Sequence, residues 1–183
     1  MNERNDTELV QQCLQGVTKA FEALVLRYQK PIFNTVYRMT KSADDAEDIT
    51  QMVFIKAYEK LDMYKPKYKF FSWIYRIAVN ETLNAIQAKG RFRTLDRSVE
   101  DEGKTPEDIY EESELNETIQ DALLEMSRDH HALIILKHFQ DFSYRDIAFI
   151  LDIPEKKVKS RLFTARQQIK EILLRRGIIS HER

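Results

Sequence analysis

Two stretches of the chain combine cations with side chains of the types that can contact nucleic acid, and the first is 64–93. It holds seven cations and seven aromatic side chains, at Tyr64, Tyr68, Phe70, Phe71, Trp73, Tyr75 and Phe92. Aromatic rings stack on unpaired bases while cations follow the phosphate backbone, so this composition favours single-strand binding. A stripe of groups that can read base edges follows the expected helix at Arg76, Asn80, Asn84, Gln87 and Arg91. The alternative is that the aromatic side chains pack in a core and the stripe is a solvated face.

The second stretch, 143–174, has the pattern of a helix-turn-helix. Ser143 can cap a short helix with Asp146 three residues later, and Asp152 occupies the turn, where it tolerates a left-handed backbone. Pro154 suits the first position of a second helix, whose apolar seam is Val158, Leu162, Ala165 and Ile169. The other face of this helix suits the major groove of duplex DNA, with Lys156, Lys157, Lys159, Ser160, Arg161, Phe163, Thr164 and Arg166. The alternative is an ordinary amphipathic surface helix.

A third surface lies on an acidic helix predicted over 44–61, which Ser42 caps. The side chains that this helix buries are expected to be Ala46, Ile49, Val53, Ala57 and Leu61. A second face carries Asp45, Asp48, Gln51, Met52 and Ile55. Met52 and Ile55 should be exposed if Ile49 and Val53 are buried. Exposed apolar side chains beside acids indicate a protein partner with complementary basic residues, and the alternative is a solvated helix face.

These surfaces need helices to position them, and the composition of the chain favours helices. The 183 residues are 43% hydrophobic and 32% charged, which fits one domain or two small ones with much wet surface. Only four glycines and four prolines are present, so long helices are expected rather than a many-stranded sheet. We expect a helix behind an N-cap at Thr18, a division at Pro31, and a helix over 71–89 that ends at Gly90. The predicted fold class is all-α.

Charge is distributed in blocks, although the net charge is only −1. Residues 65–93 hold 7 basic and 1 acidic side chains, residues 94–154 hold 5 and 16, and residues 155–183 hold 9 and 3. The two basic blocks are electrostatic footprints for phosphate. The acidic stretch over 93–114 has few apolar anchors, which predicts a solvated linker. The expected organisation is two small helical domains joined by this acidic linker, over 1–92 and 115–183, the C-terminal one a helix-turn-helix domain.

Several classes of protein are excluded by what the sequence lacks. The single cysteine, Cys13, rules out an internal disulfide framework and favours a reducing, cytoplasmic location. No apolar run approaches the roughly 18 residues that span a bilayer, so no direct membrane insertion is expected. The sequence has no glycine-rich phosphate loop, and His130 and His131 are adjacent on an expected helix and so point different ways. We therefore expect no cofactor, no metal, no catalytic residue and no enzymatic activity.

Three segments, in order, give the chain a resemblance to bacterial RNA polymerase sigma factors of the extracytoplasmic-function (ECF) subfamily of the sigma-70 family. The family's core-polymerase-binding segment is similar to DDAEDITQMVFIKAYEKLDMY at 44–64. Its promoter-melting and minus-ten-reading segment resembles FFSWIYRIAVN at 70–80. Its minus-thirty-five-reading helix-turn-helix resembles DFSYRDIAFILDIPEKKVKSRLFTAR at 141–166. The resemblance implies an alternative sigma factor that binds core polymerase, directs it to specific promoters and helps to open promoter DNA.

The resemblance also implies a role for each of the three surfaces. The face with Asp45, Asp48, Gln51, Met52 and Ile55 would bind the β′ clamp helices of core RNA polymerase. The chain would also contact the β subunit of the polymerase. The minus-ten element, with its flipped non-template base, would meet Tyr64, Lys69, Phe70, Phe71, Trp73, Arg76, Asn80 and Asn84. The minus-thirty-five duplex would meet the cationic face over 156–166. An anti-sigma factor would hold the chain inactive.

The sequence departs from the family pattern at the start of the last helix. The family usually has Gly-Thr-Val where this chain has Lys156-Lys157-Val158. Two added cations predict minus-thirty-five contacts that are more electrostatic and more sensitive to salt. Two other functions remain as alternatives. A stand-alone transcription regulator explains residues 115–174 but leaves the aromatic-cation stretch unexplained. A helical adaptor that binds only protein leaves both basic blocks unexplained.

Overall fold

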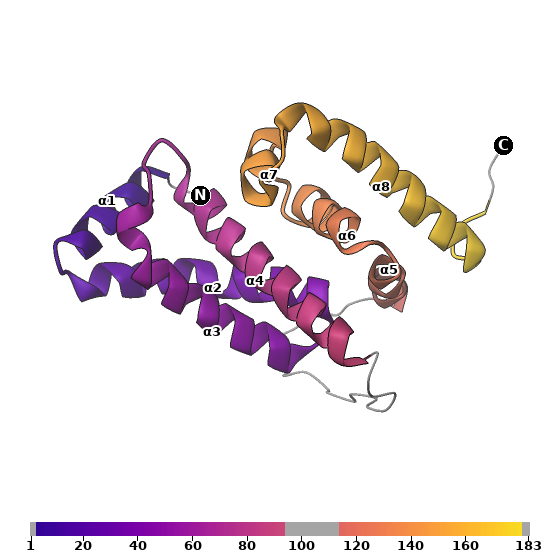
Figure 1. Ribbon diagram of the computed structural model, residues 1–183, viewed down its shortest axis with the longest axis horizontal. Coiled ribbons are helices and arrows are strands. Elements are labelled where there is room, and N and C mark those ends of the chain that lie inside the picture. The colour runs from indigo at the N-terminus through magenta and orange to yellow at the C-terminus, as the bar shows by residue number, and fades with distance from the viewer. Residues whose placement is uncertain (1–2, 94–113, 181–183) are drawn as a thin grey trace. The chain divides into compact units, whose positions relative to one another are not determined.

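The computed structural model of the chain describes residues 3–93 and 114–180, and Figure 1 shows them. In these residues all regular elements are helical, as predicted. The first group is α1 (Glu3–Leu14), α2 (Thr18–Thr40), α3 (Ala43–Glu59), the short 3₁₀-helix η1 (Leu61–Met63) and α4 (Phe70–Arg93). The second group is α5 (Glu114–Leu124), α6 (Arg128–Ile134), the π-helical turn η2 (Ile135–Phe139), α7 (Tyr144–Leu151) and α8 (Glu155–Arg175). Almost all of the predicted acidic linker lies outside the described residues.

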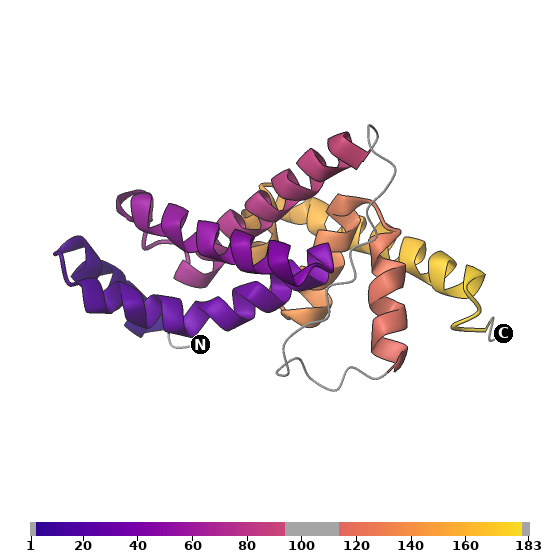
Figure 2. The same ribbon diagram turned by 90° about the horizontal axis from the view of Figure 1, so that it is seen from below.

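Helices α1 to α4 form one compact unit, and α5, α6 and α8 with the start of α7 form another. In the first unit α2 packs against α1, α3 and α4, and Figures 1 and 2 both show α2 beside α3. The α2 side chains at Leu24, Tyr28, Ile32 and Val36 are fully buried. Their spacing of four residues gives α2 one continuous apolar stripe on which the other helices pack.

The prediction that Pro31 divides this region is wrong, because α2 runs unbroken from Thr18 to Thr40 with Pro31 inside it. A proline in a helix interior removes one backbone hydrogen bond and costs about 3 kcal/mol. Ile32 and Thr35, on the C-terminal side of the proline, are fully buried, and the Thr35 hydroxyl donates to the Pro31 carbonyl at 2.9 Å. Burial on both sides of Pro31 therefore outweighs the local cost. The predicted N-cap at Thr18 is also wrong: Thr18 is the first helical residue and Val17 is the cap.

A buried carboxylate joins α1 to α2. Asp6 is only 1% exposed and accepts hydrogen bonds from the guanidinium of Arg27 and the hydroxyl of Tyr28. Burial, reinforced by the bond to Asp6, raises the pKa of Tyr28 well above its ordinary value. A buried charge needs such partners to offset its lost hydration. This contact therefore places α1 in one position on α2.

The two helices that carry predicted contact surfaces in the first unit, α3 and α4, are joined by ion pairs. Lys56 lies 2.7 Å from Glu81, and Lys89 lies 2.7 Å from Asp45. The prediction that α4 ends at Gly90 is wrong, because the helix continues to Arg93. A glycine in a helix interior costs only about 1 kcal/mol, too little to end a helix by itself.

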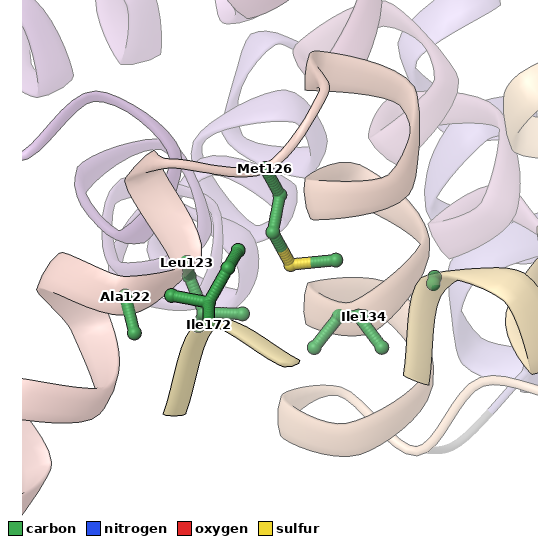
Figure 3. Packing of buried hydrophobic residues seen from close by; sticks show 6 residues of the cluster. Ala122, Leu123, Met126, Ile134 and Ile172 are labelled. Carbon is green, nitrogen blue, oxygen red and sulfur yellow. The ribbon is translucent and has the colours of Figure 1, made fainter. Parts of the chain in front are cut away.

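In the second unit the core lies where α5, α6 and α8 meet. Figure 3 shows its buried side chains at Ala122, Leu123, Met126, Ile134 and Ile172, which Ala165 completes. At one end of this core the carboxylate of Glu125 accepts hydrogen bonds from both Arg175 and Arg176. The last turns of α8 therefore hold α5, while its first turns bury only one face, at Val158 and Leu162.

Candidate nucleic-acid interface

The helix-turn-helix pattern is present as local geometry. Ser143 caps α7 by accepting a hydrogen bond from the Asp146 amide at 3.1 Å, as predicted. Asp152 ends α7 with φ of 55°, the left-handed backbone expected at the turn. Pro154 differs from the prediction by one residue: it is the N-cap of α8, and its carbonyl accepts from the Lys157 amide at 2.8 Å. A proline has no N–H to satisfy, so it fits the cap as well as the first turn.

The face of α8 opposite its core seam is open to solvent. Val158, Leu162 and Ala165 are fully buried. The predicted DNA-facing side chains are all exposed except Arg161, which is half-buried: Lys156, Lys157, Lys159, Ser160, Phe163, Thr164 and Arg166. Phe163 is 63% exposed, an unusual position for a large apolar ring in a helix of this kind. The Ser160 and Thr164 hydroxyls donate to backbone carbonyls of their own helix, so their oxygens remain acceptors.

One neighbour of this face was missed by reasoning from the sequence. His138, in η2, accepts a hydrogen bond through Nε2 from the Arg166 Nε, and the two nitrogens are 3.2 Å apart. The residues are 28 positions apart in the chain. No periodicity within α8 could have indicated a residue from another element, so only the packing of the unit brings His138 beside the cationic edge.

On α4 the three amide side chains of the predicted stripe are open to solvent, and the side chain of Arg91, at the end of that stripe, lies outside the described residues. Asn80, Asn84 and Gln87 are exposed, while Arg76 and Trp73 are half-buried. On the opposite side of the helix Ile74 and Ala78 are fully buried. The amide side chains of α4 can therefore reach a ligand that lies along this helix.

The aromatic side chains around the start of α4 divide into a buried group and exposed neighbours. Tyr64, Phe70 and Phe71 are at most 7% exposed. The Tyr64 and Trp73 ring centroids each lie 5.6 Å from that of Phe70, and the Tyr64 hydroxyl donates to the Tyr68 carbonyl at 2.7 Å. The alternative of core packing therefore holds for Tyr64, Phe70 and Phe71, whose rings are buried. They anchor both ends of the loop over 65–69, where the side chains are exposed.

The acidic face of α3 has the exposure that was predicted. Met52 is 43% and Ile55 is 52% exposed, and Asp48 and Gln51 are also exposed. Asp45 differs, because it is partly buried and paired with Lys89 of α4. Ser42 caps the helix by accepting from the Asp45 amide at 3.2 Å, as expected.

A groove beside this face was not predicted. It has a volume of about 440 Å³ and lies between α2 and α3, lined by Gln29, Lys30, Phe33, Glu47, Thr50 and Gln51. Gln51 belongs both to the predicted face and to the groove, so the two are continuous. The contribution of α2 could not be found from α3 alone, because it depends on which side of α2 the tertiary packing leaves open.

In the part of the chain that the structure describes, no group of three or more His, Cys, Asp or Glu side chains is arranged to hold a metal ion. Among the described helices none has both the length and the apolar content to cross a bilayer. His131 is 5% exposed, and burial lowers its pKa to about 4, so it is an uncharged core residue at neutral pH.

Comparison with known families accounts for both units. Residues 24–92 match Sigma-70 region 2, and residues 116–169 match Sigma-70 region 4. The first match spans the acidic face of α3 and the amide stripe of α4. The second spans the helix-turn-helix as far as residue 169.

Similar proteins agree over nearly the whole chain. RNA polymerase sigma-H factor of Pseudomonas aeruginosa is 32% identical, with 94% of this chain and 96% of that protein covered. ECF RNA polymerase sigma factor SigW of Bacillus subtilis is 33% identical, with 90% and 94% covered. The sigma factor RpoE of Bartonella quintana, solved with the anti-sigma factor NepR, matches with a TM-score of 0.70 at 27% identity, covering 85% of this chain and 97% of that chain. CnrH, solved with the cytosolic domain of CnrY, shares the fold with a TM-score of 0.70 at 20% identity, covering 92% and 97%.

Regions 2 and 4 in order, and relatives more than 30% identical over nine-tenths of the chain, give one identification. The chain belongs to the extracytoplasmic-function sigma factors of the sigma-70 family, the non-catalytic initiation factors that direct core RNA polymerase to specific promoters.

Proposed function

We propose that the three exposed surfaces divide the work of this sigma factor, with α3 docking on core polymerase, α4 reading the opened minus-ten element and α8 reading the minus-thirty-five duplex. The observation that carries the proposal is that one chain exposes an acidic and apolar helix face, an amide stripe and a cationic helix face. A stand-alone regulator needs only the third of these surfaces.

The docking face on α3 fits a basic partner helix. Asp48 and Gln51 supply charge and hydrogen bonds, and Met52 and Ile55 supply apolar area that is buried on association. We assign this face, with the adjoining groove between α2 and α3, to the β′ clamp helices, and further contacts to the β subunit. Asp45 has a smaller direct role, because Lys89 already holds its carboxylate.

The minus-ten surface combines exposed amides with an anchored loop. Asn80 and Asn84 offer donors and acceptors to a flipped non-template base, whose extrusion from the stack costs a few kcal/mol that the pocket must recover. Lys69 in the exposed loop, with half-buried Arg76 and Trp73, lies near this stripe in the chain. Buried Tyr64, Phe70 and Phe71 act by holding the loop, so their proposed role is positioning.

The minus-thirty-five surface suits an electrostatic contact with duplex DNA. Lys156, Lys157 and Lys159 lie in the first turns of α8, and Arg161 and Arg166 follow on its edges. Ser160, Phe163 and Thr164 lie between the cations and face the bases. Cations at the edges bind phosphates and orient the helix, while the central side chains select sequence.

This role involves no covalent chemistry, so the chain acts without enzymatic activity of its own and without a cofactor. Its partners place it in the cytoplasm, where core polymerase and DNA are found. An anti-sigma factor, such as the one solved with the related RpoE, would hold the chain inactive until a signal releases it.

Gel filtration of the purified chain with bacterial core RNA polymerase tests the docking assignment. The wild-type chain is expected to co-elute stoichiometrically with core. Asp48→Lys places a cation against a basic partner and should weaken the core complex at least tenfold, equivalent to about 1.4 kcal/mol. Promoter opening should fall only through the lost core binding, since Asp48 lies outside both DNA surfaces.

Asp121→Lys is the matched control, because Asp121 is an exposed acid on α5 in the other unit. It makes the same charge change and should leave core affinity unaltered. Equal loss in both variants would point to net charge rather than to the α3 face. Failure of the folded wild-type chain to co-elute with core would instead favour a stand-alone regulator.

A further inference from the structure

We propose that His138 is a positioning residue for duplex binding, which holds the Arg166 guanidinium on the DNA-facing side of α8 for a backbone phosphate. The inference rests on the proposed role of α8 in binding the minus-thirty-five duplex. His138 lies outside the helix-turn-helix itself, in the π-helical turn η2.

The hydrogen bond defines what each side chain does. Arg166 Nε donates to His138 Nε2 over 3.2 Å, and both side chains are exposed. An arginine nitrogen can only donate, so His138 Nε2 must be the unprotonated acceptor and the ring proton lies on Nδ1. The terminal nitrogens of Arg166 are then left to form a fork toward a phosphate, the geometry in which guanidinium binds such groups.

Anchoring through Nε makes phosphate binding less costly. A long arginine side chain loses rotamer freedom when it binds, and a side chain that is already held loses less. Arg166 lies two helical turns after Lys159, on the same edge of α8. His138 therefore supports the far end of a cationic edge whose near end is formed by Lys159.

The turn that carries His138 is itself well defined. Lys137 donates to the Asp141 carboxylate at 2.9 Å and to the Phe142 carbonyl at 3.2 Å. Asp141 has φ of 49°, and the Gln140 amide donates to the Ile135 carbonyl at 3.2 Å. These contacts give His138 a defined position from which to meet α8.

The groups that face His138 keep it uncharged near neutral pH. Partial burial lowers its pKa below the ordinary value, the cations of Arg166 and Lys137 lower it further, and Asp141 opposes them. The acceptor is therefore available at neutral pH. Protonation would convert Nε2 into a donor and place a cation against Arg166, so the support is expected to fail in acid.

A double-mutant cycle on the full chain tests the proposal. The probe is a fluorescent 24-base-pair duplex of random sequence in dilute salt, and the Kd is measured by anisotropy at pH 7.5. His138→Ala is expected to raise the Kd about threefold to tenfold, the range for loss of one ordinary, solvent-exposed hydrogen bond. Arg166→Ala should raise it at least as much, and the double variant should be no weaker than Arg166→Ala alone.

Two further variants make the readout specific. His138→Gln keeps an acceptor within reach and should restore most of the affinity. His130→Ala is the matched control, because the His130 ring instead meets the Gln168 amide oxygen at 2.7 Å, with no cation involved, and the Kd should stay unchanged. Circular dichroism of each variant verifies that it is folded.

The pH dependence provides the decisive comparison. The coupling between His138 and Arg166 should be largest at pH 7.5 and shrink as the pH falls through the lowered pKa of His138. Two outcomes would overturn the positioning role and still leave duplex binding by α8 intact. One is that the effects of the two substitutions on the Kd are independent at pH 7.5. The other is that, in acid, the wild-type chain binds the duplex more tightly relative to His138→Ala. An Arg166→Ala variant with unaltered Kd and salt dependence would overturn both.

Discussion

In this sigma factor, burial decides which single side chains can contact a ligand. Asn80 and Thr82 are two residues apart on α4, yet Asn80 is exposed and Thr82 is fully buried with its hydroxyl donating to the Ala78 carbonyl at 2.7 Å. A helix turns by about 100° per residue, so such neighbours face different surroundings. Function at this scale therefore depends on exact register along each helix.

Replacing Asn80 by alanine should impair promoter opening and leave core binding unaltered. The amide would be lost from an exposed position, so stability should change by less than about 0.5 kcal/mol. Loss of one or two hydrogen bonds to an extruded base should reduce open complex about tenfold, measured by permanganate reactivity of the melted strand. Gln87→Ala, on the same stripe toward the end of α4, serves for comparison. Equal loss of core binding and opening would remove Asn80 from the minus-ten pocket.

The buried His131 should make stability depend on pH. Its pKa is about 4 in the folded chain and about 6.5 when unfolded, so the unfolded chain binds more protons between these values. The contribution of His131 to the free energy of unfolding is therefore fully present above pH 6.5. It is lost as the pH decreases toward 4, by up to about 3 kcal/mol. Urea unfolding at several pH values measures this change. His131→Phe should make the free energy of unfolding less dependent on pH in this range. An identical pH dependence in the variant and the wild-type chain would contradict the role given to His131.

Helices are positioned here by end contacts as well as by their apolar faces. Ser42 and Ser143 cap α3 and α7, and each accepts a hydrogen bond from the amide three residues later. Ser127 also occupies an N-cap, that of α6, but its side chain makes no capping hydrogen bond. A serine at an N-cap can therefore form a capping hydrogen bond, and the geometry of the helix end decides whether that hydrogen bond forms.

The three serines offer a direct test at this scale. Ser143→Ala should destabilise the second unit by about 1 kcal/mol, because the amide of Asp146 loses its acceptor. Ser127→Ala should have a markedly smaller effect, since no side-chain bond is lost. Urea unfolding of both variants measures the difference. Similar destabilisation by both would show that the cap geometry of α7 contributes nothing particular.

The whole molecule combines nearly balanced charge with strong local imbalance. Its net charge is −1, yet residues 65–93 and 155–183 are basic while residues 94–154 hold 16 acidic against 5 basic side chains. Long-range attraction to DNA depends on the summed field, whereas contact depends on the local surface. A chain of this kind is suited to act on DNA when a larger partner positions it.

The free chain should accordingly bind a promoter duplex much more weakly than its complex with core polymerase. We expect the affinity for the promoter duplex to rise at least a hundredfold when core polymerase is added. Once the chain is docked on core, its contact with the promoter becomes intramolecular. Filter binding at fixed salt, repeated over a salt series, measures both the gain and its electrostatic share. Tight binding by the free chain, unaltered by core, would favour the stand-alone regulator.

The sequence by itself determined the features that depend on neighbouring residues. The all-α fold, the caps at Ser42 and Ser143, the left-handed turn at Asp152 and the exposure of Met52 and Ile55 follow from local chemistry and helical periodicity. These features involve positions within a few residues of one another. Patterns over such short ranges report directly on backbone conformation and on which face is wet.

Only the tertiary structure decided the features in which distant residues compete for the same space. Pro31 lies inside one helix because burial on either side of it outweighs its local cost. The rings at Tyr64, Phe70 and Phe71 are in the core rather than at the surface. His138 meets Arg166 because η2 packs beside α8. Each outcome depends on long-range packing, whose energy exceeds the local preferences that a sequence pattern displays.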